Sequence, residues 1–350
     1  MLQEQGKATA AVVLAAGKGT RLKSTRAKAL FQLSGRPLVW YPIDACRGAG
    51  IERIVVVVGH QADQVCAAVG EGCEFVTQEP QLGTGHALAQ CRGALGDFAG
   101  AIVVLYADTP MIDEQVIDRF LGEHLAADAD ASVLTAVLDD PGDLGRIVRG
   151  EGGDVIAIVE RRDCTPEQAA IKEINTGAYC FESPAIFEVL EDIRPENAQA
   201  EYYLTDAVAG LIARGGRVQA VPDPNADVAL GVNTRIDLAR AEALLRERTC
   251  QRLMLSGVTI VDPASAFIDP TAEIGPDTVI QPWTLIRGQT RIGRECLIGP
   301  GTTLVDASVG DRARIIHSTV LGGRVPSGAR VGPYEHIGAL AGEPVVPVSD

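Results

Sequence analysis

The sequence is poor in aromatic residues, in long hydrophobic runs and in positive charge. Aromatic side chains make up 4% of its 350 residues, whereas glycine occurs 38 times, which indicates many tight turns. No stretch approaches the roughly eighteen uninterrupted apolar residues that a membrane-spanning helix needs, and Met1 to Ala11 contain no long apolar core. We therefore expect a soluble, cytoplasmic protein without a membrane partner.

Metal-binding and redox patterns of cysteine are also missing. No two of the eight cysteines form a Cys-x-x-Cys pair, and none has a histidine nearby at ligand spacing. This argues against a zinc site or a redox pair, so we expect reduced and mostly buried thiols. The cysteines are Cys46, Cys66, Cys73, Cys91, Cys164, Cys180, Cys250 and Cys296.

Acidic residues outnumber basic ones by 46 to 31, which gives a formal net charge of -15. Nucleic-acid backbones repel such a surface, so general nucleic-acid binding is disfavoured and any anionic ligand requires a local basic patch. The length exceeds what one hydrophobic core usually covers, and it predicts about two domains.

The first part of the chain has the pattern of an α/β domain. From Ala10 to about Val221, short β-branched runs alternate with helical stretches, as in a three-layer domain with a mainly parallel sheet. Ligands of such sheets bind beyond the carboxyl ends of the strands, so the loops that open at Ala15, Gly59 and Tyr106 are candidate sites. The expected strands include 11–14, 54–58, 101–105 and 132–138, with a helix at 113–124.

The second part has a different period. A connecting helix is predicted from Thr234 to about Leu253, with Gly257 after its end. Beyond it aliphatic residues recur every six positions, with two slips, as in a parallel β-helix whose coils have three faces with one inward aliphatic each. About twelve such hexads make roughly four coils before a tail. The predicted inward residues are Ile268, Ile274, Ile280, Ile286, Ile292, Ile298, Leu304, Val309, Ile315, Leu321, Val325, Val331 and Ile337.

A glycine-bearing loop with several cations follows the first expected strand, over residues 14–22. It lacks the third glycine of a dinucleotide fingerprint, where Leu22 stands, and it lacks the Gly-Lys-Ser/Thr of a P-loop. No acid occurs between Glu4 and Asp44. Unpaired like charges repel, so this stretch favours an anion site over a solvated basic loop. Its cations are Lys7, Lys18, Arg21, Lys23, Arg26, Lys28 and Arg36.

Residues 14–21 together with Lys28 resemble the signature of sugar-1-phosphate nucleotidylyltransferases. Further blocks, in order and at matching spacing, resemble the GlmU-type N-acetylglucosamine-1-phosphate uridylyltransferases: 78–87, 105–110, 145–147, 158–160, 173–177, 201–206 and 231–233. The resemblance covers about residues 10 to 338. It implies a Rossmann-like three-layer nucleotidylyltransferase domain over 1–233, a connecting helix over 234–256, a short left-handed parallel β-helix over 257–338 and a tail over 339–350.

The resemblance also implies roles for individual residues. Asp108 and Asn233 match the residues that hold Mg²⁺, and oxygen ligands of this kind suit that ion. Arg21 and Lys28 match cations that neutralise phosphates in catalysis. The implied nucleotide contacts are Leu14, Ala15, Ala16, Gly17, Gly19, Gln78, Gly83 and Thr84, and Gln78 could offer both a donor and an acceptor to a pyrimidine. The implied sugar contacts are Tyr106, Gly145, Glu160, Asn175 and Thr205.

The implied reaction joins UTP and N-acetylglucosamine 1-phosphate into the peptidoglycan precursor UDP-N-acetylglucosamine, with release of pyrophosphate. A sugar phosphate is already anionic and needs no general base, so positioning and charge stabilisation are the expected contributions. The absence of a Ser/His/Asp or Cys/His constellation fits this chemistry, and we expect no catalytic role for His86. Two departures from the family are Ala27, which replaces a proline, and Ala107, which replaces a glycine. Pro42 is expected to kink the first helix.

In the bifunctional family a longer β-helix also acetylates glucosamine 1-phosphate, with a histidine base and lysine-rich contacts. Here only His317 and His336 lie in the repeats, in unlike surroundings, so we expect no acetyl transfer and a structural β-helix that forms a homotrimer. Three alternatives stay open: another sugar phosphate or dTTP as substrate, retained acetyl transfer, and a non-catalytic nucleotide-binding scaffold.

Overall fold

A computed structural model describes residues 7–339 of the chain. The chain divides into two compact units, one made of residues up to 32 together with 36–238, the other of 33–35 together with residues from 239 onward. The division falls after Leu238, inside helix α9 (Arg235–Leu255). Of the tail expected over 339–350, all but the first residue lies outside the described part of the chain.

The first unit is built on a sheet of nine strands. Along its main path the strand order is β11-β7-β10-β6-β1-β4-β5, and β1 runs parallel to both β4 and β6. Connections between parallel strands need crossovers, which explains the helices between these strands. The path strands are β1 (Ala8–Leu14), β4 (Arg53–Val58), β5 (Glu74–Thr77), β6 (Gly100–Tyr106), β7 (Ala131–Val137), β10 (Glu173–Ser183) and β11 (Val218–Pro222).

Strand β10 breaks the parallel pattern, because it runs antiparallel to both β6 and β7. Its register against β7 shifts between Asn175 and Tyr179. The remaining strands of the sheet, β8 (Arg146–Arg149) and β9 (Val155–Val159), form an antiparallel pair that joins β10 through Arg146. A separate two-stranded ribbon consists of β2 (Gln32–Leu33) and β3 (Arg36–Pro37).

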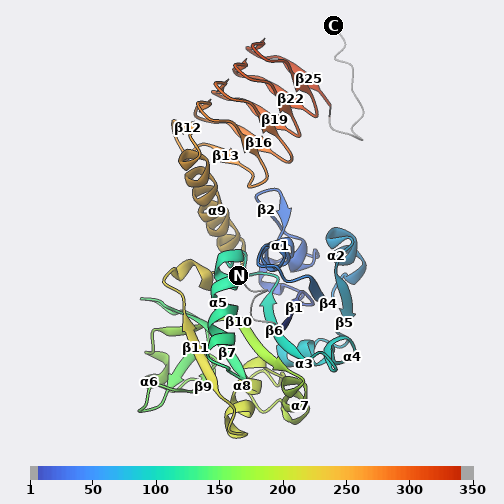
Figure 1. Cartoon of the computed structure of the whole chain (residues 1–350), viewed down its shortest axis with the longest axis vertical. Helices are drawn as coiled ribbons and strands as arrows, with labels where there is room; N and C mark the ends of the chain where they lie inside the picture. Colours follow the sequence, from blue (N-terminus) through green and yellow to red (C-terminus); the bar gives the residue numbers. More distant parts are fainter. Residues whose placement is uncertain (1–6, 340–350) are drawn as a thin grey trace. The chain divides into compact units, whose positions relative to one another are not determined.

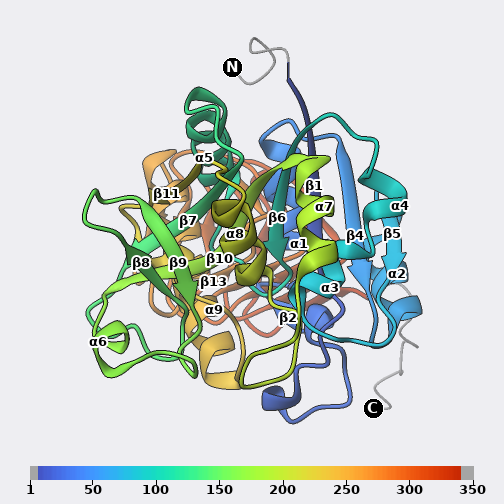
Figure 2. The same ribbon diagram turned by 90° about the horizontal axis from the view of Figure 1, so that it is seen from below.

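Helices cover both faces of this sheet, as the alternation of side chains along the strands requires (Figure 2). Ala11 and Val13 of β1 belong to one core cluster, shared with α1, α2 and α5, whereas Ala10 and Val12 belong to a second, shared with α3, α4, α7 and α8. The three-layer prediction is confirmed. The helices are α1 (Trp40–Gly48), α2 (Ala62–Val69), α3 (Thr84–Ala89), α4 (Arg92–Leu95), α5 (Glu114–Ala126), α6 (Pro166–Ala169), α7 (Ala185–Asp192) and α8 (Leu204–Ala213).

The kink expected at Pro42 was wrong. Helix α1 begins at Trp40, so Pro42 lies in its first turn rather than in its interior. Backbone N–H groups in a first turn have no partner within the helix, and proline there removes no helical hydrogen bond. The cysteines are free, as predicted, and five of the eight are buried. Burial raises the pKa of Cys46 and that of Cys91 to about 12.

The second unit contains most of α9 and a left-handed parallel β-helix of three sheets (Figure 1). One sheet is β12 (Thr259–Ile260), β15 (Val279–Ile280), β18 (Leu297–Ile298), β21 (Arg314–Ile315) and β24 (Arg330–Val331). The next is β13 (Phe267–Ile268), β16 (Leu285–Arg287), β19 (Thr303–Val305), β22 (Thr319–Leu321) and β25 (His336–Gly338). The third is β14 (Glu273–Ile274), β17 (Arg291–Ile292), β20 (Ser308–Val309) and β23 (Arg324–Val325).

The predicted inward ladder holds with one correction. Val320 is fully buried while its neighbour Leu321 is only partly covered, so the spacing is five residues both from Ile315 to Val320 and from Val320 to Val325. The series of inward residues also begins one strand earlier, at Ile260 in β12, inside the span 257–338 that the resemblance implies; an interval of eight residues separates it from Ile268. No helix within residues 7–339 is both long enough and apolar enough to cross a membrane.

Candidate active site

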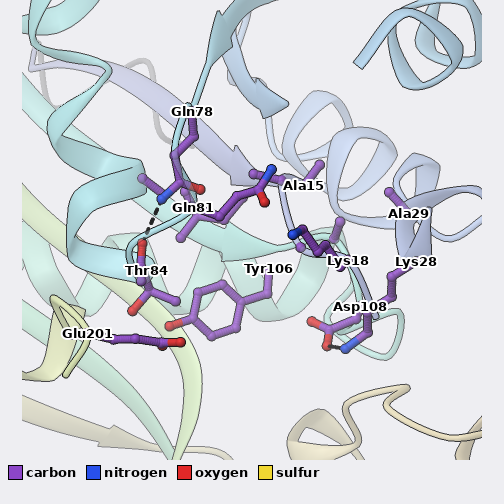
Figure 3. A pocket seen from close by; sticks show the side chains of 16 residues that line it. Ala15, Lys18, Lys28, Ala29, Gln78, Gln81, Thr84, Tyr106, Asp108 and Glu201 are labelled. Atoms are coloured by element: carbon purple, nitrogen blue, oxygen red, sulfur yellow. Dashed lines mark hydrogen bonds and ion pairs between the residues drawn. The ribbon is translucent and has the colours of Figure 1, made fainter. Parts of the chain in front are cut away.

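A pocket of about 470 Å³ opens at the carboxyl ends of β1 and β6, the edge where parallel sheets place their ligands. Figure 3 shows Tyr106 lying across it, with Lys28 and Asp108 on one side and Thr84 and Glu201 on the other. The lining consists of Leu14, Ala15, Ala16, Gly17, Lys18, Lys28, Ala29, Gln78, Gln81, Gly83, Thr84, Ala87, Tyr106, Ala107, Asp108 and Glu201.

The loop after β1 contains a row of backbone donors, most of them on residues that line this pocket. The N–H of Ala15 still donates to the Val57 carbonyl, at 2.8 Å, as a continuation of the sheet. The next four N–H groups, from Ala16 to Gly19, donate to no other residue in the described chain. Successive free N–H groups in a loop form an anion-binding concavity. Gly19 has a φ of 65°, and a Cβ there would lie 2.8 Å from the Cβ of Lys28.

Four of the predicted residues meet beside the pocket. Lys28 Nζ donates to Asp108 Oδ2 and, at 2.7 Å, to Asn233 Oδ1. Arg21 Nη2 donates to the same Asn233 oxygen at 2.6 Å. The Val232 N–H donates to the Asp108 carbonyl at 2.8 Å, which holds the two segments together. Two cations and two oxygen ligands thus converge from three separate loops.

This arrangement fits a divalent cation of the magnesium type. No cluster of three or more His, Cys, Asp or Glu side chains suited to a metal occurs in residues 7–339. Mg²⁺, however, is commonly held by one or two protein oxygens while waters and phosphates complete its octahedron. Asp108 Oδ2 and Asn233 Oδ1 already converge on one positive group, the ammonium of Lys28. Together they form a donor set of the kind this ion prefers.

The other cations of the acid-free stretch lie in different parts of the first unit. Lys18 lines the pocket, whereas Lys23 and Arg26 are exposed and lie outside its lining. Lys7 and Arg36 form ion pairs elsewhere, with Glu182 and Asp44 respectively. The charge argument therefore applies to Lys18, Arg21 and Lys28 and not to the whole stretch.

Gln78 is buried beside the pocket, and its amide orientation is fixed. Its Nε2 donates to the Gly83 carbonyl at 2.9 Å and lies 3.1 Å from His86 Nδ1. Both amide hydrogens therefore have protein partners, and only the side-chain oxygen remains to meet a ligand. Burial lowers the pKa of His86, and its neutral ring accepts this bond in the tautomer that carries the proton on Nε2. His86 orients Gln78, and Gln78 presents an acceptor alone.

Gly83 and Thr84 connect this loop to the segment before α8. A Cβ at Gly83 would lie 2.5 Å from the Tyr202 carbonyl oxygen, and its φ of 110° also favours glycine. Thr84 Oγ1 accepts the Leu204 N–H at 3.0 Å. The two motifs quoted from 78–87 and 201–206 are thus packed against each other, and Glu201 reaches the pocket beside them.

Three of the implied sugar contacts lie together next to the pocket. The Asn175 N–H donates to the Gly145 carbonyl at 2.9 Å, and a Cβ on Gly145 would lie 3.4 Å from Glu160 Oε1. Burial, followed by the charges of Asp163 and Asp206, raises the pKa of Glu160. Tyr106 lines the pocket itself. Thr205, by contrast, is buried in the first turn of α8 and is not part of the pocket lining.

The two departures from the family are accommodated locally. Ala27 has a φ of -54°, which proline could also adopt, yet it uses the N–H that proline lacks to donate to Gln61 Oε1 at 2.6 Å. This bond anchors the loop just before Lys28. Ala107 is buried in the pocket wall, where its N–H donates to the Leu14 carbonyl at 3.0 Å.

Sequence reasoning assigned no role to several residues of the site. Gln81 and Glu201 line the pocket and stand inside the motifs 78–87 and 201–206, so membership of those motifs is the signal that points to them. In the sequence Lys18 is only one of the seven cations of the acid-free stretch. Tyr179 is fully buried behind the pocket and carried no signal, because its contacts depend on the irregularity in β10.

Comparison with known proteins agrees with this geometry. Residues 11–182 match the family described as the MobA-like NTP transferase domain, and residues 271–305 match the bacterial transferase hexapeptide family. The bifunctional protein GlmU of Geobacillus sp. strain WCH70 is 43% identical over 93% of this chain and 71% of its own length. That of Syntrophotalea carbinolica is 45% identical over 90% of this chain and 68% of its own length.

The chain belongs to the GlmU family. It is accordingly an enzyme, a nucleotidyltransferase of the UDP-N-acetylglucosamine pyrophosphorylase type, as the sequence resemblance implied. A solved structure from Bacillus anthracis, assigned as a glucose-1-phosphate thymidylyltransferase, has a TM-score of 0.58 at 22% identity. It covers 68% of this chain and 95% of its own, and it supports the fold of this GlmU-family chain.

Proposed function

We propose that this chain transfers a uridylyl group from UTP to N-acetylglucosamine 1-phosphate in a Mg²⁺-dependent, in-line reaction that releases pyrophosphate. One observation carries the proposal. Four successive N–H groups at Ala16–Gly19 have no partner in the described chain, and the first three belong to residues that line the same pocket as Lys28 and Asp108, so a polyphosphate would meet both dipoles and charges there. Membership of the GlmU family supports this assignment of substrates.

The reaction needs positioning more than it needs proton transfer. A phosphate oxygen of the sugar attacks the α-phosphorus of UTP, the bond to the bridging oxygen breaks, and pyrophosphate leaves in line. Arg21 and Lys28 offset the charge that develops on the transferred and leaving groups. Mg²⁺ held by Asp108 and Asn233 would add further neutralisation of the phosphates. Lys28 must then give up its bonds to both oxygens and turn to the phosphates.

The base and sugar subsites follow from the remaining contacts. Gln78 presents only an acceptor, which suits the imino N–H of uracil and disfavours cytosine, whose equivalent ring nitrogen is itself an acceptor. Ala15, Gly17, Gly83 and Thr84 would enclose the base and ribose. Glu160 and Asn175, beside Gly145, offer hydrogen-bonding groups for the sugar hydroxyls and the acetamido group.

The β-helix is assigned a structural role in a homotrimer, without acetyl transfer by the residues of this sequence. No lysine occurs after Lys172, so the repeats contain none of the lysine contacts that the resemblance attaches to acetylation. His317 stacks on Tyr334 with ring centroids 6.0 Å apart, and His336 Nε2 contacts the Gly338 carbonyl. Light scattering of the purified chain would measure the oligomer, and a thiol-release assay with acetyl-CoA would measure acetylation.

A nucleotide-by-sugar panel tests the main proposal. Pyrophosphate release would be measured with UTP, dTTP, CTP and ATP against the 1-phosphates of N-acetylglucosamine, glucose and galactose, with and without Mg²⁺. We expect the highest kcat/KM for UTP with N-acetylglucosamine 1-phosphate. A preference for dTTP or for glucose 1-phosphate would support a related nucleotidyltransferase instead. Activity without divalent metal would contradict the roles of Asp108 and Asn233.

A further inference from the structure

Arg146, the first residue of β8, carries a buried guanidinium that has no carboxylate partner among residues 7–339. The residue is only 2% exposed, and a buried charge is costly unless hydrogen bonds satisfy it. Backbone carbonyls satisfy it here. Nε donates to Ala169 at 3.3 Å, Nη2 donates to Gly142 at 2.9 Å, and Nη1 donates to Leu144. Every nitrogen of the guanidinium therefore holds backbone, and two of them hold the loop that precedes β8.

The other arginine of β8 is bonded in a different way. Arg149 makes two bonds of 2.7 Å to the carboxylate of Glu173, and a third to the Gly153 carbonyl in the turn after β8. Its charge is thus neutralised by an ordinary bidentate pair. The bonds of Arg146 neutralise no acid, so their effect is to fix the positions of the carbonyls that accept them.

The loop before β8 depends on Arg146 for its orientation. Arg146 supplies every hydrogen bond that joins residues 140–144 to the rest of the described chain. The other bonds are internal to the loop, from the Gly142 N–H to Asp140 Oδ1 and from the Leu144 N–H to the Pro141 carbonyl. The Leu144 side chain packs against the first core cluster. Without Arg146 the loop would stay attached through this side chain, but its peptide groups would be free to turn.

One of the carbonyls held by Arg146 belongs to the peptide that carries the Gly145 N–H. A trans peptide is planar, and its C=O and N–H point in opposite directions, so the bond to the Leu144 carbonyl sets the direction of this N–H. The Gly145 carbonyl lies in the next peptide, which the Asn175 N–H holds separately at 2.9 Å.

The Gly145 N–H is a donor beside the sugar subsite. It donates to no residue of the described chain, although Gly145 is buried and buried N–H groups normally have a partner. A Cβ on Gly145 would lie 3.4 Å from Glu160 Oε1 and 3.6 Å from the Asn175 Cβ. The donor is therefore next to the two side chains assigned to the sugar.

We infer that Arg146 is a positioning residue for the sugar phosphate, which orients the Gly145 N–H as a hydrogen-bond donor to the sugar. The inference rests on the proposed function, which places the sugar at Gly145, Glu160 and Asn175. A donor that turns away weakens binding of the sugar phosphate. The nucleotide contacts lie on other loops, at 14–19 and at 78–84, and do not depend on Arg146.

Steady-state kinetics of pyrophosphate release, with the full chain, separate the two subsites. Arg146→Met removes the guanidinium and keeps a long unbranched side chain. We expect the KM for N-acetylglucosamine 1-phosphate to rise at least about tenfold, while the KM for UTP stays within about threefold. Arg146→Lys should give an intermediate rise, since lysine keeps the charge but lacks the planar fork. A merely structural role would lower the Tm without this split between the two Michaelis constants.

Arg149→Met is the matched control, because it makes the same substitution in the same strand but removes bonds to Glu173 and Gly153. Both Michaelis constants should stay within about twofold of those of the unaltered chain. Hydrogen exchange measured by mass spectrometry should be faster over residues 140–145 in Arg146→Met and unchanged there in Arg149→Met.

An equal rise in the two Michaelis constants, no rise, unchanged exchange over 140–145, or the same selective rise in Arg149→Met overturns the inference. If Arg146→Met does not fold, Arg146→Lys must raise the KM for the sugar phosphate selectively, by at least about threefold, and an unchanged KM there overturns the inference. If the nucleotide-by-sugar panel selects another sugar phosphate, the proposed function fails, and the same comparison with that sugar phosphate still decides the role of Arg146.

Discussion

The two units of this chain use their polar groups in opposite ways. In the β-helix, inward-facing threonines donate to backbone carbonyls, as Thr278 does to Gly293 and Thr290 does to Arg287. In the α/β unit, the loop after β1 leaves four consecutive N–H groups without partners in the described chain. Successive N–H groups without protein partners, three of them on residues that line a pocket, offer a row of donors to an anionic ligand. The hydrogen bonds of the threonines stabilise the β-helix, whereas the loop after β1 keeps its N–H groups for a ligand.

The units differ also in the sequence distance over which their contacts form. Each strand of the β-helix pairs with the strand one coil away, as Ile268 does with Ile286 and Ile286 with Leu304. Lys28 instead meets partners 80 and 205 residues away, Asp108 and Asn233. A substitution in one unit should therefore affect stability, whereas a substitution at the pocket should affect activity.

The largest effect is expected for Asp108→Ala. Loss of the carboxylate leaves the metal with a single protein ligand and Lys28 with a single partner, so kcat should fall about a hundredfold or more. Pyrophosphate release at several Mg²⁺ concentrations measures this. Asp139→Asn is the control, because Asp139 is a fully exposed carboxylate paired with Lys172. Unchanged activity and Mg²⁺ demand in Asp108→Ala would remove Asp108 from the site.

A loss of stability without a loss of activity is expected for Ile286→Ala in the β-helix core. Ile286 is fully buried, and truncation there should lower the free energy of unfolding of the second unit by about 2–5 kcal/mol. Pyrophosphate release at 25 °C should stay within about twofold, because Ile286 and the pocket belong to different compact units and residues without shared partners act independently. Leu285→Ala, at the neighbouring position that points outward, should destabilise much less. Urea denaturation measures both variants. Equal losses of unfolding free energy in Ile286→Ala and Leu285→Ala would show that the inward aliphatic residues do not account for the stability of the β-helix.

A more selective effect is expected for Gln78→Ala. Without the Gln78 oxygen the imino N–H of uracil is left without a partner, which costs about 1–3 kcal/mol of binding free energy. This loss lowers kcat/KM for UTP by roughly 5- to 150-fold. The KM for the sugar phosphate should change less. Gln90→Ala, which removes only the amide beside the other nitrogen of His86, should have a milder effect on UTP. Equal changes in the two Michaelis constants would contradict a role in reading the base.

The smallest effect is expected for Glu160→Gln, and it concerns pH. Burial and two acidic neighbours raise the pKa of Glu160 in the folded chain, so ionisation above that pKa destabilises the fold. The neutral glutamine removes this penalty, and the Tm at pH 8 should therefore rise or stay equal. The gain should vanish as the pH falls through the unfolded pKa of about 4.3, where glutamate is neutral in both states. Sugar-phosphate KM should rise, and a lower Tm at pH 8 would show that the ionised form is stabilised.

The sequence by itself determined what depends on local period and on residue type. Alternating β-branched runs predicted the three-layer unit, and aliphatic residues at intervals of six predicted the β-helix. Each repeat of a β-helix pairs only with its neighbours, so the spacing of its inward residues is visible in the sequence. Residue type and motif were enough to select Arg21, Lys28, Asp108 and Asn233. They did not predict that Lys28 would donate to both oxygens, or that Val320 rather than Leu321 would turn inward.

Only the tertiary structure decided which atoms of the site residues are free to bind a ligand. The Gly83 carbonyl and His86 leave Gln78 with an acceptor alone, although its side chain contains both donor and acceptor. Ion pairs remove Lys7 and Arg36 from the basic patch, and the first-turn position of Pro42 removes its expected kink. Asn175 Nδ2 reaches the buried Tyr179 hydroxyl because the register of β10 shifts between these two residues. Hydrogen-bond satisfaction depends on partners distant in the sequence, and a pattern of nearest neighbours contains no information about them.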